Sequence, residues 1–584
     1  MKRRVSVFLA ALLLISAFSS ALPVLAETAD GNIQVRSQPT YLYSMNHAAT
    51  TDALFTRQLP TIPYLDAEDF FDHIYTVDFS TSKNADGTYS ITSENGVMVA
   101  DAEKDTLYFD GFEFYILSNV DKQDSVLAND YAITAKPVIE GETKGLTLDL
   151  GAYGIDLIEY GGRVYLPLPT LSDLVSITYN SAEYIDGNLY YVHTYESASV
   201  DGYFDRSPLY QSVERDPAAS DFTYRELCFC MDHFYGAPEK AQIAESIREK
   251  GFDKALDEYS GGTRTAKALL KSNDLMDFFI GLMYLDEVFF DGGHTSLTLE
   301  MFLVLLDTES PLYEAMEKKY AEHPEYVMAM MHALMNMQDR ETLSRKITPL
   351  RDPAYEKYEL VKSWGEDARF IRSGDTGVFV FDSFIDEVVE LFKWSLDWAV
   401  ENGIKNFAVD LTCSGGGSSD VAAYIFTVMM NGKAHSNVFD LRTLFTTTGN
   451  IICEKVTLDL NLDGVFDEKD CDLAYDLNFA VLSTPLAFSS GNLLPCLARD
   501  NGIAVLGETS GGGSCALSRC YAEGCHYFML SSPRKIFKAD GSDADSGSGA
   551  DYYLVQQDAE GNKDYSGLYD LDDIGVKMHE FYGN

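Results

Sequence analysis

Three kinds of hydrophobic pattern follow one another along this chain of 584 residues. Over 61–200, short alternating apolar runs are separated by Gly, Asn and Asp, which predicts a separate β-rich N-terminal domain. Over 206–365, apolar residues recur at helical spacing, which predicts a helical subdomain. Over 366–584, strand-like and helical runs alternate, which predicts an α/β domain with a mostly parallel sheet. The interval 27–60 is polar and irregular, and we interpret it as a linker.

The α/β pattern of the last third resolves into individual elements. The expected strands are Thr376–Phe381, Phe407–Leu411, Asn478–Thr484 and Ile503–Leu506, and the expected helices are Phe384–Glu401, Val421–Met430 and one that ends near Arg499. The carboxyl ends of parallel strands meet at one edge of a sheet, so a site is expected there.

The first residues read as an export signal. Lys2, Arg3 and Arg4 precede the apolar run Val5–Leu14, and we expect cleavage after Ala26. The chain is therefore expected to be a secreted or extracytoplasmic bacterial protein, and an uncleaved signal that acts as a membrane anchor is the alternative. No later stretch reaches about 18 uncharged apolar residues, so no other membrane-spanning helix is predicted.

The net charge narrows the classes of partner. A formal charge of −47 should repel nucleic acid and anionic membranes, so no nucleic-acid partner is expected. Acidity of this size suits solubility outside the cell and cation binding. The sequence carries no phosphate-binding loop and no nucleotide fingerprint, so no organic cofactor is expected. It does not determine the oligomeric state.

The cysteines are odd in number. There are nine, and export would permit disulfides, so at least one thiol is left over. Cys453 and Cys471 bracket an acidic loop and are the best candidates for a bridge. No Cys/His spacing resembles a zinc site.

The most promising chemistry lies at a strand-to-helix junction, Phe488-Ser489-Ser490-Gly491. Backbone N–H groups converge at the first turn of a helix and can hold the negative charge that develops when a serine attacks a carbonyl. Ser489 is therefore a candidate nucleophile. Taken alone, however, a serine in this position is most often only a helix cap.

Two further segments can complete a hydrolytic site. Three glycines end the loop Asp410–Gly417, so the N–H of Gly415 can join that of Ser490 in an oxyanion hole. His294, in the glycine turn Asp291–Ser296, can supply a general base.

Together these segments resemble the C-terminal processing (tail-specific) serine protease family. The resemblance rests on the glycine loop Asp410–Gly417, on the serine before a helix that ends in Asp500-Asn501-Gly502, and on the histidine turn Asp291–Ser296, and it covers roughly 206–584. It implies a crotonase-like ββα catalytic core and hydrolysis of protein or peptide substrates through a serine nucleophile.

One departure from the family indicates the branch. In the bacterial processing branch a lysine base follows the serine, whereas here the comparable loop is Thr509–Ser514, with glycine in the lysine position. The tricorn-core branch uses histidine oriented by a carboxylate. The resemblance therefore implies that Asp545 orients His294, and Asp543 and Asp551 are rivals.

Several assignments remain open at the level of sequence. Alignment on Asp500 places the nucleophile at Ser489, with Ser490 donating through its backbone. Thr412 and Cys413 replace the Arg-Gly usual in the family, which leaves open a catalytically inactive peptide-binding homologue at the cell surface. An ester or amide hydrolase of another kind that uses the same site is the other alternative.

A second resemblance lies in the N-terminal domain. The segment Gly161–Leu168, followed by Leu171–Val175, resembles the small β domain shared with the N-terminus of copper amine oxidases. The resemblance carries no copper site, and it implies substrate contact, cell-wall association or plain support.

An acidic loop predicts a structural calcium ion. Oxygen-bearing residues occupy loop positions 1, 3, 5, 9 and 12, with Gly464 at position 6 and an apolar residue at 8, a pattern that resembles the dockerin-type calcium loop. The expected ligands are Asp459, Asn461, Asp463, the backbone carbonyl of Val465, Asp467 and Asp470. The alternative is a solvated Asp/Asn-rich turn.

Overall fold

The computed structural model describes residues 26–27, 32–42, 47–75, 77–118, 130–178, 180–193, 213–237, 240–298, 308, 311–522 and 526–583. Apart from Ala26, the predicted signal peptide lies outside this description, as does Cys525. Of the helices described, none is both long enough and apolar enough to cross a bilayer.

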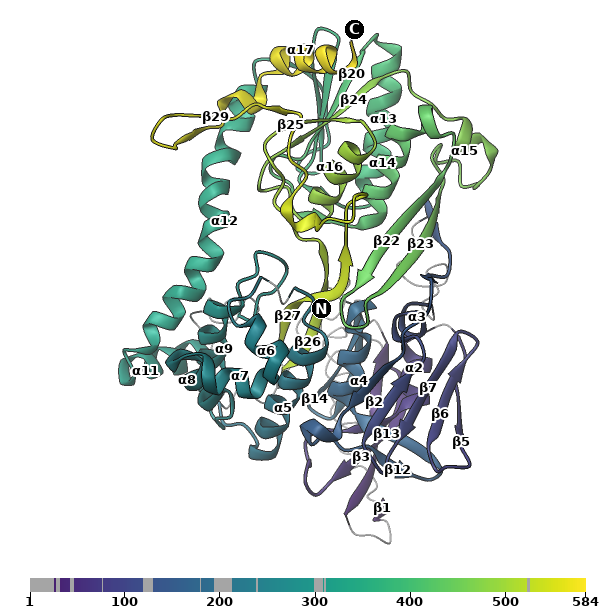
Figure 1. Ribbon diagram of the computed structural model, residues 1–584, viewed down its shortest axis with the longest axis vertical. Coiled ribbons are helices and arrows are strands. Elements are labelled where there is room, and N and C mark those ends of the chain that lie inside the picture. Colours follow the sequence, from purple (N-terminus) through teal and green to yellow (C-terminus); the bar gives the residue numbers. More distant parts are fainter. Residues whose placement is uncertain are drawn as a thin grey trace, which may run out of the picture.

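Two sheets form the β-rich N-terminal region (Figure 1). The larger has the order β12-β13-β4-β3-β2-β15-β14, with β1 paired to β2; its strands are Ala26–Glu27 (β1), Ile33–Leu42 (β2), His47–Thr56 (β3), Tyr64–Asp66 (β4), Ile158–Tyr160 (β12), Arg163–Pro167 (β13), Asn180–Ile185 (β14) and Asn188–His193 (β15). The smaller has the order β11-β8-β7-β6-β5; its strands are Ser80–Lys83 (β5), Tyr89–Ser93 (β6), Gly96–Asp101 (β7), Thr106–Phe109 (β8) and Leu146–Asp149 (β11). The helices of this region are Ala67–Ile74 (α2), Phe112–Ser118 (α3) and Leu168–Val175 (α4).

The prediction of a linker over 27–60 is wrong for much of that interval. Strands β2 and β3 pair antiparallel from Ile33–Thr56 to Tyr41–His47 and lie inside the larger sheet, not at its edge. The strands contain many polar residues, above all Thr, and lack the regular apolar alternation that marks a strand in sequence. Their stability comes from pairing and from one buried face, which a local pattern does not reveal.

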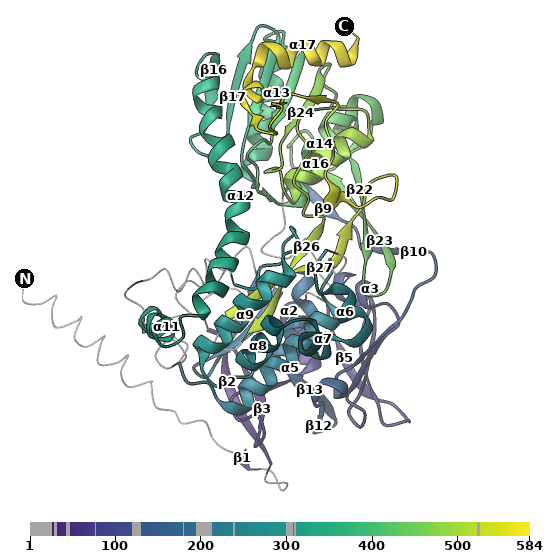
Figure 2. The same ribbon diagram turned by 60° about the vertical axis from the view of Figure 1, so that its left-hand side comes forward.

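The helical subdomain contains seven described helices, which are Pro217–His233 (α5), Ala244–Lys250 (α6), Phe252–Tyr259 (α7), Gly261–Leu270 (α8), Leu275–Phe289 (α9), Pro311–Glu322 (α11) and Tyr326–Tyr355 (α12). Local chemistry sets their ends: the side chain of Asp216 accepts hydrogen bonds from the first-turn N–H groups of α5, with Pro217 at the first position. Figures 1 and 2 show α12 running from this cluster to the opposite end of the molecule.

The α/β core lies at that opposite end. Its sheet has the order β16-β17-β18-β20-β24-β25-β28, parallel from β18 onward. The strands are Glu359–Ser363 (β16), Arg369–Ser373 (β17), Thr376–Val380 (β18), Asn406–Asp410 (β20), Asn478–Ser483 (β24), Ala504–Gly507 (β25) and Tyr552–Tyr553 (β28). Strands β18 and β20 are buried along their whole length, as expected for a parallel sheet covered on both faces.

Helices cover both faces of this sheet. One face carries Glu387–Glu401 (α13), Ser419–Ala434 (α14) and Ser490–Asp500 (α16), and the other carries the end of α12 and Leu571–Tyr582 (α17). Each expected strand and helix of this region is present within a few residues of its predicted limits. Helix α13 begins later than expected because Ser383–Phe384 (β19) pairs with Gly416–Gly417 (β21). The crotonase-like assignment of this core stays a prediction.

A third sheet joins the core to the rest of the molecule. Its order is β10-β23-β22-β27-β26, with β9 also paired to β23. The strands are Ala132–Thr134 (β9), Val138–Glu140 (β10), Val438–Phe445 (β22), Asn450–Leu458 (β23), Cys515–Ala522 (β26) and His526–Ile536 (β27). The hairpin β26–β27 leaves the core and reaches the helical subdomain, which Figures 1 and 2 both show.

The predicted bridge between Cys453 and Cys471 is wrong. Both residues are free thiols: Cys453 lies in β23, and Cys471 lies in Glu468–Asp472 (α15), where its Sγ is 3.5 Å from Asn437 Oδ1. Flanking a loop in sequence did not bring these two side chains together.

Candidate active site

Ser489 has a backbone conformation that serine rarely adopts. Its φ is +55° and its ψ is −121°, directly before α16. This combination is not the left-handed helical conformation of His435, whose φ is 47° and ψ is 48°. A non-glycine residue held there costs about 1–3 kcal/mol, and such strain gathers at functional sites. The strained backbone at Ser489 therefore makes this turn a candidate functional feature.

The Ser489 hydroxyl does not cap the helix that it precedes. The side chain accepts no hydrogen bond from the first turn of α16, although the backbone carbonyl of Ser489 accepts from Asn492 and Leu493 at 2.9 and 2.8 Å. Within the described residues Oγ has no hydrogen-bond partner. The ordinary helix-cap interpretation therefore does not account for this serine.

Two glycine loops hold the serine turn from either side. A Cβ on Gly416 would come within 2.8 Å of the Ser489 Cβ, and one on Gly513 would come within 2.9 Å of the Ser489 backbone nitrogen. The Ser489 N–H donates to the carbonyl of Gly512 at 3.0 Å. Only glycine permits these approaches at the positive φ that both residues adopt.

The same contacts explain why no lysine follows the serine. In the loop Thr509–Ser514, a Cβ on Gly511 would lie 2.0 Å from the carbonyl oxygen of Pro485, and one on Gly512 would lie 2.8 Å from that of Asp545. A side chain of any size is excluded there. A base for Ser489 would therefore have to come from another part of the chain.

The His294 loop is fixed to the hairpin β26–β27. Ser531 Oγ accepts the His294 N–H at 2.9 Å and donates to Asp291 Oδ2 at 2.9 Å. Asp291 also accepts the Gly293 N–H at 2.7 Å and the Thr295 hydroxyl at 2.6 Å. The aspartate of the sequence motif thus closes the turn and is not a partner of the imidazole in this set of bonds.

The imidazole of His294 lies against the residue that precedes the candidate nucleophile. Its ring centroid is 4.9 Å from that of Phe488. Nδ1 is buried and has no hydrogen-bond partner in the described part of the chain. Burial lowers the pKa of His294 to about 4, against the opposing effects of Asp545 and of the Cys515 carbonyl. The neutral ring is therefore the form present near pH 7, as a general base requires.

The structure places the His294 ring against Phe488, the residue before Ser489, and no hydrogen bond joins His294 to Ser489 among the described residues. The ring contacts Phe488, whereas no described partner reaches Ser489 Oγ. In apo structures such bonds are often long and tighten only when substrate binds. The predicted pair is neighbouring but not yet engaged.

Asp545 lies close to this centre but is occupied by other partners. It accepts the Ser514 N–H at 2.5 Å and pairs with Lys240 Nζ at 2.9 Å. Burial alone would raise its pKa, but the Ser514 N–H and the Lys240 ammonium hold it below the usual range. Asp545 is thus an anion whose field reaches His294 without a direct bond in this structure.

The two rival carboxylates serve other parts of the fold. Asp543 pairs with Lys535 at 2.9 Å and accepts the Asp545 N–H at 2.8 Å. Asp551 accepts the Val505 N–H at 2.9 Å at the end of the core sheet. Neither is among the charges that shift the pKa of His294, so Asp545 is the better placed of the three.

The two predicted oxyanion donors differ in availability. Ser490 begins α16, and its hydroxyl donates to the carbonyl of Gly417 at 2.7 Å, which ties the serine turn to the glycine loop. The Gly415 N–H instead donates to the carbonyl of Asp382 at 3.2 Å. Gly415 would have to weaken that bond before it could hold an oxyanion.

Sequence reasoning missed Arg340 and Lys240. The Arg340 guanidinium lies 4.2 Å from the centre of the Phe488 ring and donates to the Leu486 carbonyl at 2.7 Å. Its charge also opposes protonation of His294. Arg340 comes from α12 and Lys240 precedes α6, so no motif near the serine could have pointed to either.

The predicted calcium loop adopts a closed turn. Asp459 Oδ2 accepts the Gly464 N–H at 2.7 Å, and Asp470 accepts the Asn461 N–H at 3.1 Å. Asp459 and Asp470 are almost fully buried. Asn461 Oδ1 is buried with no partner among the described groups, so it is free to bind a cation.

The other predicted ligands lie nearer the surface of this loop. Asp463 Oδ1 accepts the Val465 N–H at 3.0 Å, and Asp467 accepts the Lys469 N–H at 2.8 Å. Lys469 Nζ lies 3.4 Å from Asp463 and 3.3 Å from Asp467. Among the described residues, the carboxylates of this loop do not form a group of three or more whose ligand atoms lie within 4.8 Å of one another, so the calcium ligand set stays a prediction.

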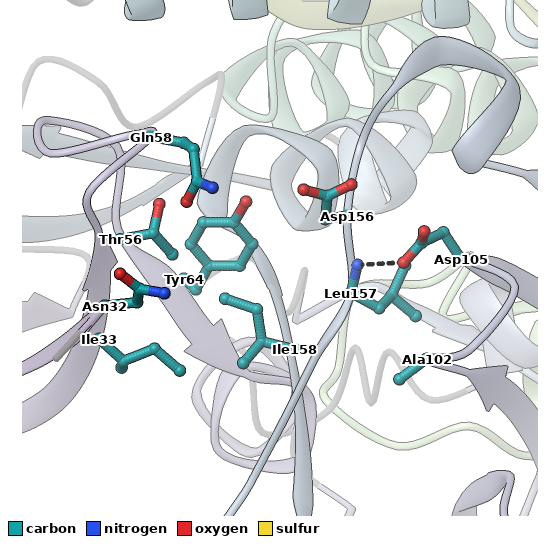
Figure 3. Close-up of a pocket in the computed structure, with 10 residues that line it drawn as sticks. All are labelled: Asn32, Ile33, Thr56, Gln58, Tyr64, Ala102, Asp105, Asp156, Leu157 and Ile158. Atoms are coloured by element: carbon teal, nitrogen blue, oxygen red, sulfur yellow. Dashed lines mark hydrogen bonds between the residues drawn. The ribbon is translucent and has the colours of Figure 1, made fainter. Parts of the chain in front are cut away.

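A polar pocket of about 360 Å³ lies away from this chemistry, in the N-terminal region (Figure 3). The side chains of Tyr64, Gln58 and Asp156 face it, beside Asp105, which accepts the Leu157 N–H at 2.7 Å. The residues that line it include neither a histidine nor a serine. This pocket holds none of the hydrolytic residues and is not the candidate site.

Comparison with known proteins gives matches only among solved structures. No protein-family model and no curated protein matches the chain. The photosystem II D1 C-terminal processing protease matches at 15% identity and a TM-score of 0.24, over 32% of this chain and 45% of that one. A putative S41 protease from Bacteroides fragilis matches at 14% and 0.26, over 39% and 57%. A putative peptidase from Parabacteroides merdae matches at 13% and 0.36, over 62% and 96%.

The chain thus spans 45% and 57% of the first two of these structures. All three carry protease or peptidase names. With every TM-score below 0.5, the likeness carries no conclusion about this chain by itself.

Proposed function

We propose that this chain is a serine peptidase of the C-terminal processing type, with Ser489 as nucleophile and His294 as general base. One observation carries the proposal: a serine in a strained turn, with an unpartnered hydroxyl, follows Phe488, and the Phe488 ring packs against a half-buried histidine whose buried Nδ1 is also unpartnered. Strain and unsatisfied polar atoms cost stability and are retained where they serve a function.

The reaction would begin with proton transfer. His294, neutral near pH 7, takes the proton of the Ser489 hydroxyl as the oxygen attacks the peptide carbonyl, and then gives the proton to the leaving amine. In the second half of the reaction, His294 takes a proton from the water that attacks the acyl-enzyme and returns it to Ser489 Oγ as the ester bond breaks. The engagement requires the imidazole and the hydroxyl to close into a hydrogen bond when substrate is bound.

Backbone donors would stabilise the tetrahedral intermediate. The N–H of Ser490, at the start of α16, points along the positive end of the helix dipole. Gly415 supplies the second N–H once its bond to Asp382 is released. Each such donor is worth about 3–4 kcal/mol of transition-state stabilisation in other hydrolases.

Asp545 would act on His294 through its charge. An anion near the ring favours the imidazolium that forms during the reaction. Lys240 and the Ser514 N–H keep Asp545 ionised while it does so.

A covalent probe tests the assignment. We expect an organophosphonate that reacts with activated serines to label the full chain, with the adduct mapped to Ser489. Ser489→Ala should abolish labelling and peptide hydrolysis, and the matched variant Ser490→Ala should keep its labelling because it retains the backbone N–H. Full peptide hydrolysis by Ser489→Ala would refute the assignment.

Two outcomes would select the alternatives. The engaged N–H of Gly415 favours an inactive peptide-binding homologue, which would bind peptides without labelling or turnover. Turnover of small esters or amides without any peptide cleavage would indicate another hydrolase at the same site.

The proposal extends to location and to the catalytic core. A signal peptide cleaved near Ala26 would make the peptidase secreted or extracytoplasmic, and the core would be crotonase-like. N-terminal sequencing of the protein from culture medium tests the first statement.

Calcium would be a structural ion of the loop 459–470. Its ligands would be Asp459, Asn461, Asp463, the Val465 carbonyl, Asp467 and Asp470, and the buried, unpartnered Asn461 Oδ1 supports this. Calorimetric titration should give a binding heat that Asp463→Ala loses and Glu468→Ala, a control in the same loop, keeps. Identical heats in all three proteins would remove the site.

A further inference from the structure

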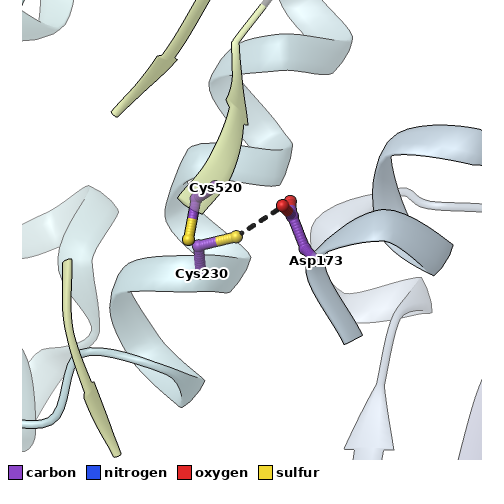
Figure 4. A group of neighbouring side chains, drawn as sticks. All are labelled: Asp173, Cys230 and Cys520. Atoms are coloured by element: carbon purple, nitrogen blue, oxygen red, sulfur yellow. Dashed lines mark hydrogen bonds between the residues drawn. The ribbon is translucent and has the colours of Figure 1, made fainter. Parts of the chain in front are cut away.

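A second cluster of reactive groups lies far from Ser489, where three parts of the chain meet. Asp173 comes from α4, Cys230 from α5 and Cys520 from β26, and Figure 4 shows their side chains converging. Their ligand atoms all lie within 4.8 Å of one another. Cys230 Sγ is 3.1 Å from Asp173 Oδ2, and none of the three is more than 1% exposed. Their burial distinguishes these three residues from the exposed acidic side chains that are common on protein surfaces.

A fourth group faces the same cluster. Glu226 lies four residues before Cys230, on the same face of α5, and is completely buried. Its Oε2 accepts the Thr170 hydroxyl at 2.8 Å, whereas its Oε1 has no hydrogen-bond donor in the described chain. The carboxyl groups of Glu226 and Asp173 are neighbours, since each shifts the pKa of the other.

The cluster gathers buried acidic groups whose ionised forms have no matching cation among the described residues. Burial raises the pKa of Asp173 to about 7 and that of nearby Glu183 to about 8. The cations that act on these groups are Arg519, which opposes the shift of Glu183, and Arg225, which opposes that of Glu226. Neither arginine acts on Asp173 or Cys230. Buried carboxylates and thiolates are costly unless they are paired or coordinate a metal.

We propose that Asp173, Glu226, Cys230 and Cys520 form a structural site for zinc or a similar borderline-soft divalent cation. Two thiolates select such a cation over calcium or magnesium, which prefer oxygen ligands. A tetrahedral zinc ion places its ligand atoms about 3.3–3.8 Å apart. The ligand atoms of Asp173, Cys230 and Cys520 lie within 4.8 Å of one another, and Glu226, which is outside this group, would move toward the ion to complete the set. Four protein ligands and full burial are typical of a structural site, because they leave no position for substrate.

Binding the ion would displace the protons of the cluster. Both thiols and any protonated carboxyl would release theirs to solvent, and no oxidant is consumed. The free Oε1 of Glu226 would gain a partner, and Tyr521 would keep its N–H bond of 2.8 Å to the other oxygen of Asp173.

The ion would join the N-terminal region, the helical subdomain and the hairpin β26–β27. Because β27 carries Ser531, which holds the His294 loop, the site would also steady the proposed base. This consequence depends on the proposed peptidase function, whereas metal binding itself does not.

The full chain, purified without chelator and equilibrated with zinc, tests the site by metal analysis. We expect about one zinc ion per chain that Cys230→Ser and Cys520→Ser bind at least about tenfold more weakly. Cys228→Ser is the matched control, since Cys228 is also buried in α5 but lies on another face of the helix. It should bind zinc as the wild type does.

A second readout does not depend on how well the variants fold. Cobalt(II) added to the wild-type chain should give the intense thiolate-to-cobalt absorption of a tetrahedral site, and zinc should displace it. Absence of this band, or zinc retained by both cysteine variants, would overturn the proposal. So would a Cys230–Cys520 disulfide found by peptide mapping under non-reducing conditions. Loss of zinc with unchanged peptide hydrolysis would refute only the link to His294.

Discussion

The surroundings of two half-buried histidines, His233 and His294, show how a histidine of the core differs from the candidate general base. Burial lowers the pKa of each to about 4. His233 ends α5 among aromatic rings, 5.2 Å from Phe229 and 5.8 Å from Tyr153, and its Nε2 lies 3.2 Å from the Tyr153 hydroxyl. Among the described residues His294 has Phe488 as its ring neighbour and the Cys515 carbonyl as a backbone partner, and its Nδ1 is unpartnered.

The difference lies in hydrogen bonding and not in burial. A perturbed pKa marks both residues equally, so it cannot by itself identify a base. His233 has a bonded ring nitrogen and packs tightly, which is how a core histidine is stabilised. The unpartnered Nδ1 of His294 belongs to a ring that contacts Phe488, the residue before the strained Ser489, and the functional argument rests on this difference from His233. The following variants test it, from the largest expected effect to the smallest.

Removing the imidazole of His294 should abolish most activity and cost little stability. His294→Ala is expected to lower kcat/KM for peptide hydrolysis by about 10²–10⁴-fold, the usual contribution of a general base. Its Tm should change little, because the lost ring carries an unsatisfied buried nitrogen. Steady-state kinetics and calorimetry measure the two effects, and a large loss of Tm with full activity would reverse the comparison.

Removing the imidazole of His233 should do the opposite. His233→Ala is expected to lower the free energy of unfolding of its region by about 2–3 kcal/mol, through the lost packing and the lost bond to Tyr153. Its kcat/KM, measured per folded molecule below its Tm, should match the wild type. A loss of activity comparable to that of His294→Ala would show that the comparison fails.

The pH profile of activity should reflect the lowered pKa of His294. The ring must be neutral to act as a base, so the acid limb of kcat/KM should fall near pH 4, below the ordinary value of 6.5. A limb at 6.5 or above would mean that another group limits the reaction.

The same shift affects stability. The unfolded chain binds a proton below pH 6.5 that the folded chain accepts only near pH 4, so the free energy of unfolding should fall as pH decreases through that interval. The slope is about 1.4 kcal/mol per pH unit for each buried histidine. His233→Ala and His294→Ala should each lose their own part of this slope, which chemical denaturation at several pH values can measure.

Neutralising Asp545 should give the smallest effect. Asp545→Asn removes an anion that favours protonated His294, so the acid limb should move further down and kcat/KM should fall by roughly tenfold or less. Asp551→Asn is the control, since Asp551 accepts only a backbone bond at the sheet edge. An equal loss in both variants would assign Asp545 a purely structural role.

The sequence predicted the core better than its surroundings because the two are stabilised differently. Strand β20 and helix α13 lie close to their expected limits, since buried apolar runs and amphipathic periodicity are local signals. Strands β2 and β3 escaped prediction, since their polar residues depend on pairing within a sheet. The glycine loops and the two candidate catalytic side chains were visible as motifs.

Other parts of the site could not be foreseen from spacing. Lys240, just before α6, and Arg340, in α12, contact residues that lie more than a hundred positions away in the sequence. Contacts of this kind produce no periodic pattern in the sequence. The cluster of Asp173, Cys230 and Cys520 likewise joins positions from three regions, so the absence of a zinc spacing was no guide. The predicted bridge between Cys453 and Cys471 was wrong for a related reason, because positions on either side of a loop in sequence need not be close in space.

The attachment of the His294 loop to the strand after Cys520 has a wider consequence. The candidate nucleophile and base lie in parts of the chain that fold around different cores, and the paired strands β26–β27, together with the Lys240–Asp545 ion pair, link these parts. The proposed peptidase activity would therefore appear only after all regions of the chain have folded and docked. A fragment that keeps Ser489 but lacks the helical subdomain would also lack His294 and should therefore show no peptide hydrolysis.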